Sequence, residues 1–380
     1  MDSRSRVPSI DALRGLVMIL MALDHTRDFF HSAAMSFQPE DLTRTTVPIF
    51  FTRWITHFCA PVFMFTAGLG ASFWLQRDRT LGQLSSYLVK RGLWLAFLEL
   101  TVVRFALVFN FHVDLVVVTV LWGLGWSMVA LALLVHLPVR VLAVFSLAVI
   151  ALHNLADPID ASQFGSAAWL WNCLHQLGVF HVGGIGVLVS YPLVPWFAVM
   201  AAGFCLGHIA ARPWMLRIGL GVTIAFVIVR GINIYGDPAP WSHSVLSFLR
   251  CNKYPPSLDF LLMTLGPALL LLVWFDRFAF TPTNPLIVFG RVPLFYFLLH
   301  LYLIHALAIP LALMRYGHAG FIFDALPSMG GSPRLYPPNY GYPLWAVYII
   351  WIAAVAVLYP ACRWYARLKQ TRTAWWLTYL

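Results

Sequence analysis

Charged residues are scarce in this sequence. Asp, Glu, Lys and Arg make up 11% of the 380 residues, whereas 60% are hydrophobic. About a quarter of the residues of a soluble domain are charged, so a chain of this composition is not expected to fold in water. The sequence therefore predicts an integral membrane protein, whose first partner is the lipid bilayer.

Cysteine is also scarce, and its spacing excludes the common uses of the residue. No two cysteines have the spacing of a CxxC motif or of a metal site. Small buried hydrophobic side chains are the simplest interpretation, and no bound metal is expected. The five are Cys59, Cys173, Cys205, Cys251 and Cys362.

Signals for nucleic-acid binding and for secretion are missing as well. The excess of 25 Lys and Arg over 15 Asp and Glu usually belongs to cytoplasmic loops in a membrane protein, so no nucleic-acid partner is expected. The first apolar stretch, from Ile10, lacks a small-residue cleavage site and is expected to remain as a transmembrane helix. Because there is no repeat and no Gly/Ser linker, residues 1–380 are predicted to form one membrane domain.

Apolar segments of about 20 residues, the length that crosses the hydrocarbon core, define the predicted fold. We predict an all-α, polytopic membrane helix bundle of about ten transmembrane helices. The stretch around Trp169 and Trp171 could be re-entrant or interfacial, so an eleventh span stays open. The segments cover residues 10–30, 49–75, 87–109, 116–136, 139–152, 190–209, 214–234, 257–275, 285–310 and 342–362.

The distribution of Lys and Arg predicts the orientation of the bundle. With the N-terminus inside, 14 of these residues fall on the cytoplasmic side and five on the other side. Positive residues gather in cytoplasmic loops, so both termini are predicted to lie in the cytoplasm. The long loops on the outer face are then 31–48, 153–189, 235–256 and 311–341, and they are long enough to shape an extracytoplasmic pocket.

The first segment is unusual because it carries six ionisable side chains. Arg14 and His25 are eleven residues apart, which places them on one helix face about 16 Å apart along the axis. Each charge at membrane depth costs on the order of 2.5 to 3.5 kcal/mol, so this face is expected to line a cavity. Snorkelling of Arg14, and ion pairs within the helix, are the alternative interpretation. The six are Asp11, Arg14, Asp24, His25, Arg27 and Asp28.

Two stretches carry a resemblance to a known family. "SIDALRGLVMILMALDH", from Ser9, followed by "THFCAPVFMFTAGLGASFWLQR", from Thr56, resembles the heparan-alpha-glucosaminide N-acetyltransferase family and, more closely, its uncharacterised bacterial relatives. "NKYPPSLDFLLMTLGPALLLL" at 252–272 and "FGRVPLFYFLLHLYLIH" at 289–305 look like later landmarks of those relatives. The spacing of Arg14 and His25 is also similar to that of the acyltransferase type 3 family, in which such a pair is implicated in acyl transfer.

The resemblance implies a reaction and a location. The expected reaction moves an acyl group, most often acetyl from cytoplasmic acetyl-CoA, to a sugar amine or hydroxyl on the far side of the membrane. The partners are then acyl-CoA and a glycan or amino-sugar acceptor, in the inner membrane of a bacterium, with a homodimer left open. A solute transporter or flippase, and a non-catalytic assembly or sensor protein, remain as alternatives.

The candidate catalytic residues are His25, Asp24 and His57. An imidazole beside a carboxylate is suited to take up a proton near neutral pH. His57 precedes Pro61 by one turn and would lie near the outer end of the first helix. The lysosomal member of the family has no such Asp-His pair and uses a histidine from the following loop, so His31 or His57 could be the counterpart.

The candidate acyl-CoA ligands are Arg14, Lys253 and Arg291. Lys253 precedes a helix expected to begin at Pro256 or Ser257, whose free N–H groups would favour an anion. This site would hold a phosphate of CoA or an anionic acceptor. Its predicted position on the outer face conflicts with a cytoplasmic donor unless the cofactor threads a tunnel. Arg291 begins a row of polar groups that continues to Tyr296 and His300 along the ninth segment.

Overall fold

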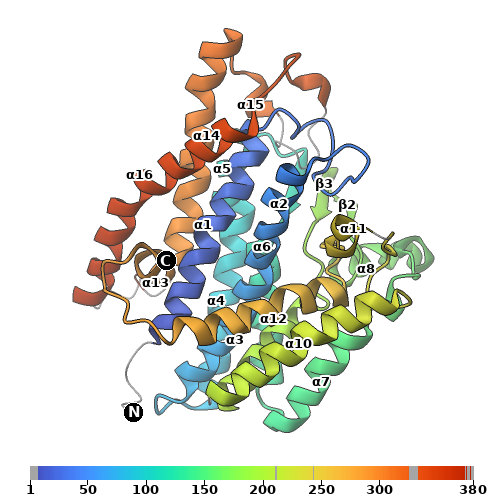
Figure 1. Cartoon of the computed structure of the whole chain (residues 1–380), viewed down its shortest axis with the longest axis vertical. Coiled ribbons are helices and arrows are strands. Elements are labelled where there is room, and N and C mark those ends of the chain that lie inside the picture. The colour runs from blue at the N-terminus through green and yellow to red at the C-terminus, as the bar shows by residue number, and fades with distance from the viewer. Residues whose placement is uncertain are drawn as a thin grey trace. The chain divides into compact units, whose positions relative to one another are not determined.

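The computed structural model is mainly helical (Figure 1) and describes residues 7–209, 212–242, 244–324, 333–372, 374 and 377. The chain divides into two compact units. The first contains Ala60–Leu100 and Val113–Phe278, and the second contains Ile10–Cys59, Thr101–His112 and Ala279–Leu380. Because the chain passes between the units repeatedly, they are not two consecutive domains, and a single membrane domain over 1–380 stays a prediction.

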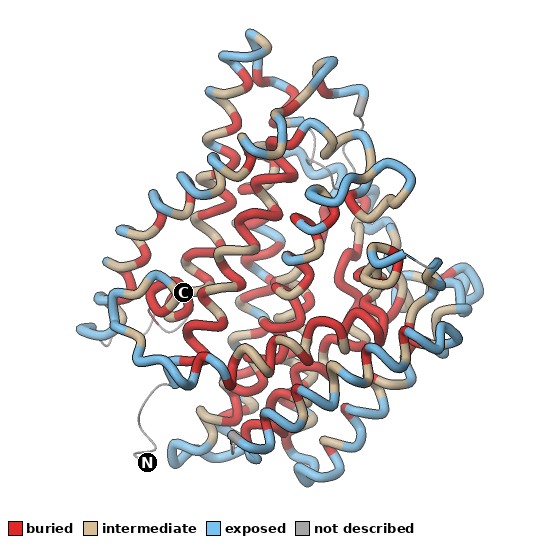
Figure 2. The backbone as a smooth tube through the Cα atoms, in the orientation of Figure 1, coloured by how far each residue is buried: buried red, intermediate tan, exposed pale blue. Residues whose placement is uncertain are grey.

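The second unit combines helices from both ends of the chain. Helix α1 is buried along most of its length (Figure 2), and the indole of Trp351 on α16 donates a hydrogen bond to the carbonyl of Ile19 on α1, at 2.8 Å. The helices of this unit are α1 (Pro8–Phe30), α2 (Val47–Trp54), η1 (Ile55–Phe58), α5 (Arg104–Val108), α13 (Pro285–Arg291), α14 (Pro293–Tyr316), α15 (Phe321–Asp324), η5 (Pro333–Leu335) and α16 (Leu344–Thr371).

A helix break interrupts the predicted span 285–310. Asn284 caps α13 by accepting a hydrogen bond from the amide of Leu286, and Pro285 occupies the first turn. Helix α13 ends at Arg291, and Pro293 starts α14. Proline lacks an N–H and favours the first position of a helix, so it separates the two helices here. The prediction of one continuous span was wrong at this point.

The first unit contains the middle of the chain. Glycines bring its helices into backbone contact, as in α4 and α6, where Gly92 and Gly125 face each other. Small residues allow such close approach in membrane bundles. The turn η2 (Glu99–Val103) crosses from this unit into the second after Leu100. The helices of the first unit are α3 (Cys59–Leu75), α4 (Leu81–Leu98), α6 (Val120–Leu134), α7 (Val139–Leu152), η3 (His153–Ala156), η4 (Ala161–Ala167), α8 (Ala168–Leu174), α9 (Trp196–Ile209), α10 (Arg212–Ile232), α11 (Val245–Leu249) and α12 (Leu258–Phe275).

A small sheet in the first unit corrects the all-α prediction. Strand β1 (Leu115–Val118) pairs in parallel with β3 (Ile185–Val189), which pairs antiparallel with β2 (Gly178–Val182). Gly183 and Gly184 join β2 to β3 with positive φ angles of 57° and 86°, as a two-residue hairpin turn requires. Residues 116–118 were expected in a helix, but this valine run has high strand propensity and finds a partner strand.

Six helices among the described residues are long and apolar enough to cross a membrane. They overlap six of the predicted segments, and the helical membrane protein is confirmed at that level. They are Val47–Leu75, Val139–Ala156, Pro213–Ile232, Leu258–Phe275, Pro293–Tyr316 and Leu344–Thr371.

The remaining four segments explain the difference from the predicted count. Helix α1 carries several charges, α6 and α9 have only 15 and 14 residues, and the segment 87–109 includes the π-helical turn η2. About ten spans therefore stays a prediction. So does the cytoplasmic location of both termini, since residues 1–6 and most of 373–380 lie outside the described part of the chain.

An exposed apolar face on α10 indicates contact with lipid. Leu216, Leu220, Ile224, Val227 and Ile228 are between 39% and 56% exposed. Their spacing places them on one side of the helix. A continuous apolar face of this kind is covered by lipid in a membrane protein, whereas soluble proteins rarely expose one.

Candidate functional site

The first-helix motif, from Ser9, and the landmark that begins at Phe289 are in backbone contact. A Cβ atom at Gly15 would collide with the carbonyl of Leu286, and one at Gly290 would collide with the carbonyl of Asp11. The Arg291 side chain lies beside the Asp11 carboxylate, with Nε 3.7 Å from Oδ2. The first-helix motif is therefore packed directly against α13, the helix that contains the start of the FGRVP landmark.

His25 contacts the same group of helices, nearer the C-terminal end of α1. Its Nδ1 lies 2.7 Å from Nε2 of His300 on α14, and Phe297 packs edge-on against the ring. His300 is fully buried, and so is Tyr296, whose hydroxyl has no hydrogen-bond partner among the described residues. Asp11 thus has a partner on α13 and His25 has one on α14, and a functional role for this face of the first helix stays a prediction.

The Asp24 carboxylate contacts residues other than those around His25. It forms ion pairs with Arg53 of α2 and with Arg27, whose Nη2 lies 3.2 Å from its Oδ1. Arg53 Nε donates to Glu40 Oε1 at 2.8 Å, and His57 Nε2 lies 3.1 Å from the same oxygen. Asp24 and His57 therefore belong to one ionic network, linked through Arg53 and Glu40, whereas His25 bonds to His300.

Glu40 is held ionised in this network. Burial alone would raise the pKa of its carboxyl, but the Arg53 guanidinium and the hydrogen bond from His57 outweigh burial and keep the pKa well below its usual value. The loop that follows α1 is thereby tied to α2 and η1 by a charged side chain. Removing one partner of such a pair leaves a buried charge uncompensated, which is strongly destabilising.

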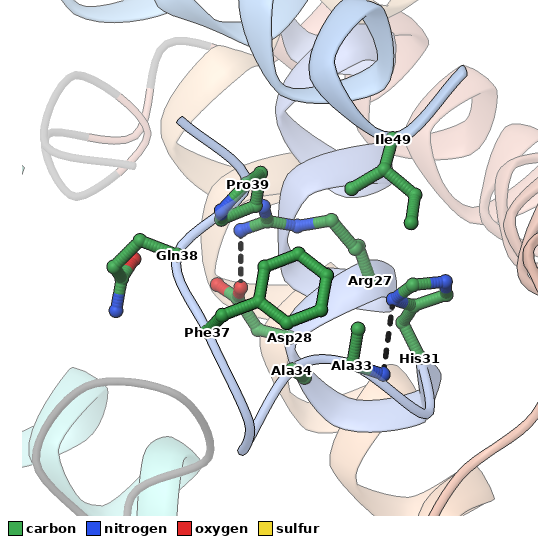
Figure 3. A pocket seen from close by; sticks show the side chains of 9 residues that line it. All are labelled: Arg27, Asp28, His31, Ala33, Ala34, Phe37, Gln38, Pro39 and Ile49. Carbon is green, nitrogen blue, oxygen red and sulfur yellow. Dashed lines mark hydrogen bonds and ion pairs between the residues drawn. The ribbon is translucent and has the colours of Figure 1, made fainter. Parts of the chain in front are cut away.

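A small pocket lies beside this network, at the C-terminal end of α1. Figure 3 shows the Arg27 guanidinium beside the Asp28 carboxylate, and the Phe37 ring close to both. Arg27 donates to Asp28 at 2.5 Å, and Nδ1 of His31 accepts a hydrogen bond from the amide of Ala33 at 3.3 Å. The lining residues are Arg27, Asp28, His31, Ala33, Ala34, Phe37, Gln38, Pro39 and Ile49.

The family model described as "Heparan-alpha-glucosaminide N-acetyltransferase, catalytic" matches residues 6–241, more than half of the chain. The chain belongs to this family. No curated protein matches the sequence. Membership makes the chain a transmembrane acyltransferase at the level of its family. The match contains the first-helix motif and the Asp24–His57 network, and it ends before the two later landmarks.

His31, one of the two counterparts considered for the family's loop histidine, is poorly suited to act as a base. Burial, and then the charge of Arg27, lower the pKa of His31 from 6.5 to about 4. A general base works best when its pKa lies near the operating pH, so this ring would be a weak base at pH 7. His57 remains the other counterpart, held by Glu40.

The lowered pKa of His31 predicts a pH-dependent stability. The unfolded chain binds more protons than the folded chain between pH 6.5 and about 4, so the stabilisation is complete above pH 6.5 and declines as the pH falls toward 4. Between pH 7.5 and 4.5, we expect the melting temperature of His31→Asn to fall by less than that of the wild type. Parallel curves for the two proteins would show that His31 is protonated equally in both states.

Lys253 belongs to the first unit, whereas the other candidate residues belong to the second. Its Nζ lies 5.0 Å from the Tyr254 ring centroid, and Ser257 caps α12. The amides of Leu258, Asp259 and Phe260 donate to Asn154, Gly236 and Ser257. The helix start is therefore as expected, but these three amides already have protein acceptors. An acyl-CoA contact at Lys253 stays a prediction that rests on the lysine itself.

The sequence did not predict the residues that bond to the candidate catalytic side chains. Neither Arg53 nor Glu40 was singled out. His300 was noted as a polar group on a core helix, but not as the partner of His25. The available signal was its spacing of four residues from Tyr296, which places two polar side chains on one face of an apolar helix.

Proposed function

We propose that this protein transfers an acyl group, acetyl by preference, from acyl-CoA at the cytoplasmic face to a sugar amine or hydroxyl on the far face. The observation that carries the proposal is the His25–His300 imidazole pair at 2.7 Å, placed on the motif helix of a transmembrane acyltransferase family. Two hydrogen-bonded imidazoles within a bundle are suited to proton transfer.

His25 acts in this proposal as a general base. It takes the proton from the acceptor's amine or hydroxyl as that atom forms a bond to the thioester carbonyl carbon. The carbon–sulfur bond then breaks, and the CoA thiolate leaves and recovers the proton from the imidazolium. Transient acylation of His25 is the other route, and it is recognised by ping-pong kinetics with a burst of free CoA.

Arg14 and Arg291 are proposed to bind the phosphates of acyl-CoA. Arg14 lies about 16 Å from His25 along α1, and Arg291 of α13 lies beside Asp11, one turn nearer the N-terminus of α1. An extended pantetheine arm spans such a distance. This arrangement agrees with the proposed orientation, in which the N-terminal end of α1 is cytoplasmic and the loop from 31 onward is outside.

The acceptor is proposed to enter at the C-terminal end of α1. An open pocket there has a Tyr-rich wall and the exposed Arg315, whose guanidinium lies 4.7 Å from the Tyr342 ring centroid. Aromatic faces and hydroxyls suit a sugar ring, because tyrosine combines apolar area with a polar tip. The pocket is lined by Ser32, Met35, Ser36, Arg315, Tyr336, Pro337, Asn339, Tyr340, Gly341, Tyr342 and Pro343.

Reconstituted protein tests the reaction and its direction together. Protein in vesicles with acetyl-CoA on one side and a panel of amino sugars and glycosides on the other should release free CoA only when an acceptor is present. Vesicles carrying Arg14→Gln should need a higher acetyl-CoA concentration for the same rate. If the wild type neither binds nor consumes acetyl-CoA and instead moves a solute across the bilayer, the protein is a transporter.

A further inference from the structure

The two imidazoles of His25 and His300 form an in-plane hydrogen bond. Their ring centroids lie 4.9 Å apart, and the ring planes differ by only 9°. A face-to-face stack would separate the rings by at least the contact distance of about 3.5 Å, yet the nearest nitrogens are 2.7 Å apart. The rings therefore meet edge to edge, so that a proton on one nitrogen points at the lone pair of the other.

The second nitrogen of His300 determines which ring donates that proton. Its Nδ1 lies 3.1 Å from the carbonyl oxygen of Tyr296, one turn earlier on α14. A carbonyl only accepts, so Nδ1 must carry the hydrogen. His300 is fully buried and has no carboxylate partner among the described residues, so an imidazolium there would be costly. A neutral His300 with its hydrogen on Nδ1 has the lone pair on Nε2, and it accepts from His25.

This order of protons fixes the tautomer of His25. Because Nδ1 of His25 donates to His300, the hydrogen of a neutral His25 ring is on Nδ1 and its basic lone pair is on Nε2. We infer that His300 is a positioning residue that holds His25 in the tautomer with Nε2 as the base. The inference rests on the proposed function, because it assigns His300 a part in the reaction of His25.

The helix geometry explains why His300 can do this. The Tyr296 carbonyl and the His300 side chain are joined by one turn of α14, so the ring cannot rotate without breaking that bond. When Nε2 of His25 takes a proton from the acceptor, its Nδ1–H becomes a charged donor, and the bond to His300 strengthens. A neutral partner thus orients His25 and stabilises its charged form without removing the proton needed by the leaving thiolate.

Two substitutions of His300 distinguish a role in orienting His25 from a role in packing alone. Gln retains a side-chain oxygen that can accept from His25 Nδ1, whereas Leu retains bulk alone. We expect His300→Gln to keep kcat within about tenfold and His300→Leu to lower it by about 100-fold, the lower end of what a general base contributes. The KM for acyl-CoA should change less than threefold in both, because His300 lies away from the proposed phosphate contacts.

Nitrogen NMR of histidine-labelled protein in detergent micelles reads the tautomer without turnover. The His25 signals are assigned by their loss in His25→Asn, and the wild type should show a protonated Nδ1 and an unprotonated Nε2. His300→Leu should give a mixture of tautomers. The control is His305→Gln, which alters another fully buried histidine of α14, bonded to the Ala106 carbonyl, and should leave His25 unchanged.

The outcomes separate this inference from the proposed function. An unprotonated Nδ1 on His25 in the wild type, or an unchanged tautomer and kcat in His300→Leu, would overturn the role of His300. If His300→Leu does not fold, the wild-type spectrum and the His300→Gln rate still decide. The predicted tautomer in a wild type that transfers no acyl group would support the proton order and reject the proposed reaction.

Discussion

His25→Ala is expected to abolish most acyl transfer, with a loss of about 10² to 10⁴-fold in kcat, the range that a general base supplies. The side chain is partly exposed on α1 and bonds to His300, so its removal deletes the proposed base and little packing. Acyl-CoA binding, measured by the protection of the protein against heating, should persist. Steady-state transfer of labelled acetyl to the best acceptor of the panel gives the rate.

His57→Ala is the matched comparison for this prediction. His57 is more buried than His25 and bonds to Glu40, so its loss should lower the melting temperature and reduce transfer by less than tenfold. The reverse result, with transfer lost in His57→Ala and retained in His25→Ala, would assign the base to His57. It would also agree with the loop histidine that the sequence resemblance implies for the lysosomal member of the family.

Gly290→Ala is expected to prevent the stable folding of the second unit. The new methyl group would overlap the carbonyl of Asp11 and the backbone around it, and this backbone cannot rotate away as a side chain would. Overpacking commonly costs about 1 to 3 kcal/mol, and a backbone clash belongs at or above the upper end of that range. Gly15→Ala should behave alike, because its methyl would meet the carbonyl of Leu286.

The controls for the glycine prediction are Gly221→Ala and Gly231→Ala on α10. Nothing lies within 4 Å of a Cβ atom at either position, and alanine favours a helix over glycine by about 0.5 to 1 kcal/mol. Both should therefore be as stable as the wild type or slightly more. Size-exclusion profiles of detergent extracts after heating provide the comparison. A monodisperse Gly290→Ala with a wild-type melting temperature would mean that α1 and α13 are not in backbone contact.

The face of the first helix could be predicted because it depends only on helix geometry. The spacing of Arg14 and His25 predicts that both lie on one side of α1, and the cost of charges in lipid directs that side to the protein interior. In the structure, Asp11 and His25 have partners on α13 and α14. Their partners could not be predicted in the same way. His300 is 275 residues from His25 in the sequence, and no local pattern states which two helices become neighbours.

The contacts of loop residues and the position of the strands also could not be predicted from the sequence. Glu40 lies in a loop without periodicity, so its contacts with Arg53 and His57 depend on the path of the chain after α1. The run of β1 is apolar and short, and such a run fits a buried strand or a helix equally well. The break before Pro293 was readable, since a proline inside a predicted helix commonly marks an end.

The pairing of α1 with α13 and α14 has a consequence for biosynthesis. The first helix leaves the ribosome with its charges, but Arg291 and His300 are made about 280 residues later, roughly 15 to 60 seconds at usual elongation rates. Until then, Asp11 lacks Arg291 and His25 lacks His300. Asp11 and His25 of the first helix therefore gain Arg291 and His300 only when the last quarter of the chain is made. A nascent chain that stops before residue 285 would hold the motif helix without the helices that receive it.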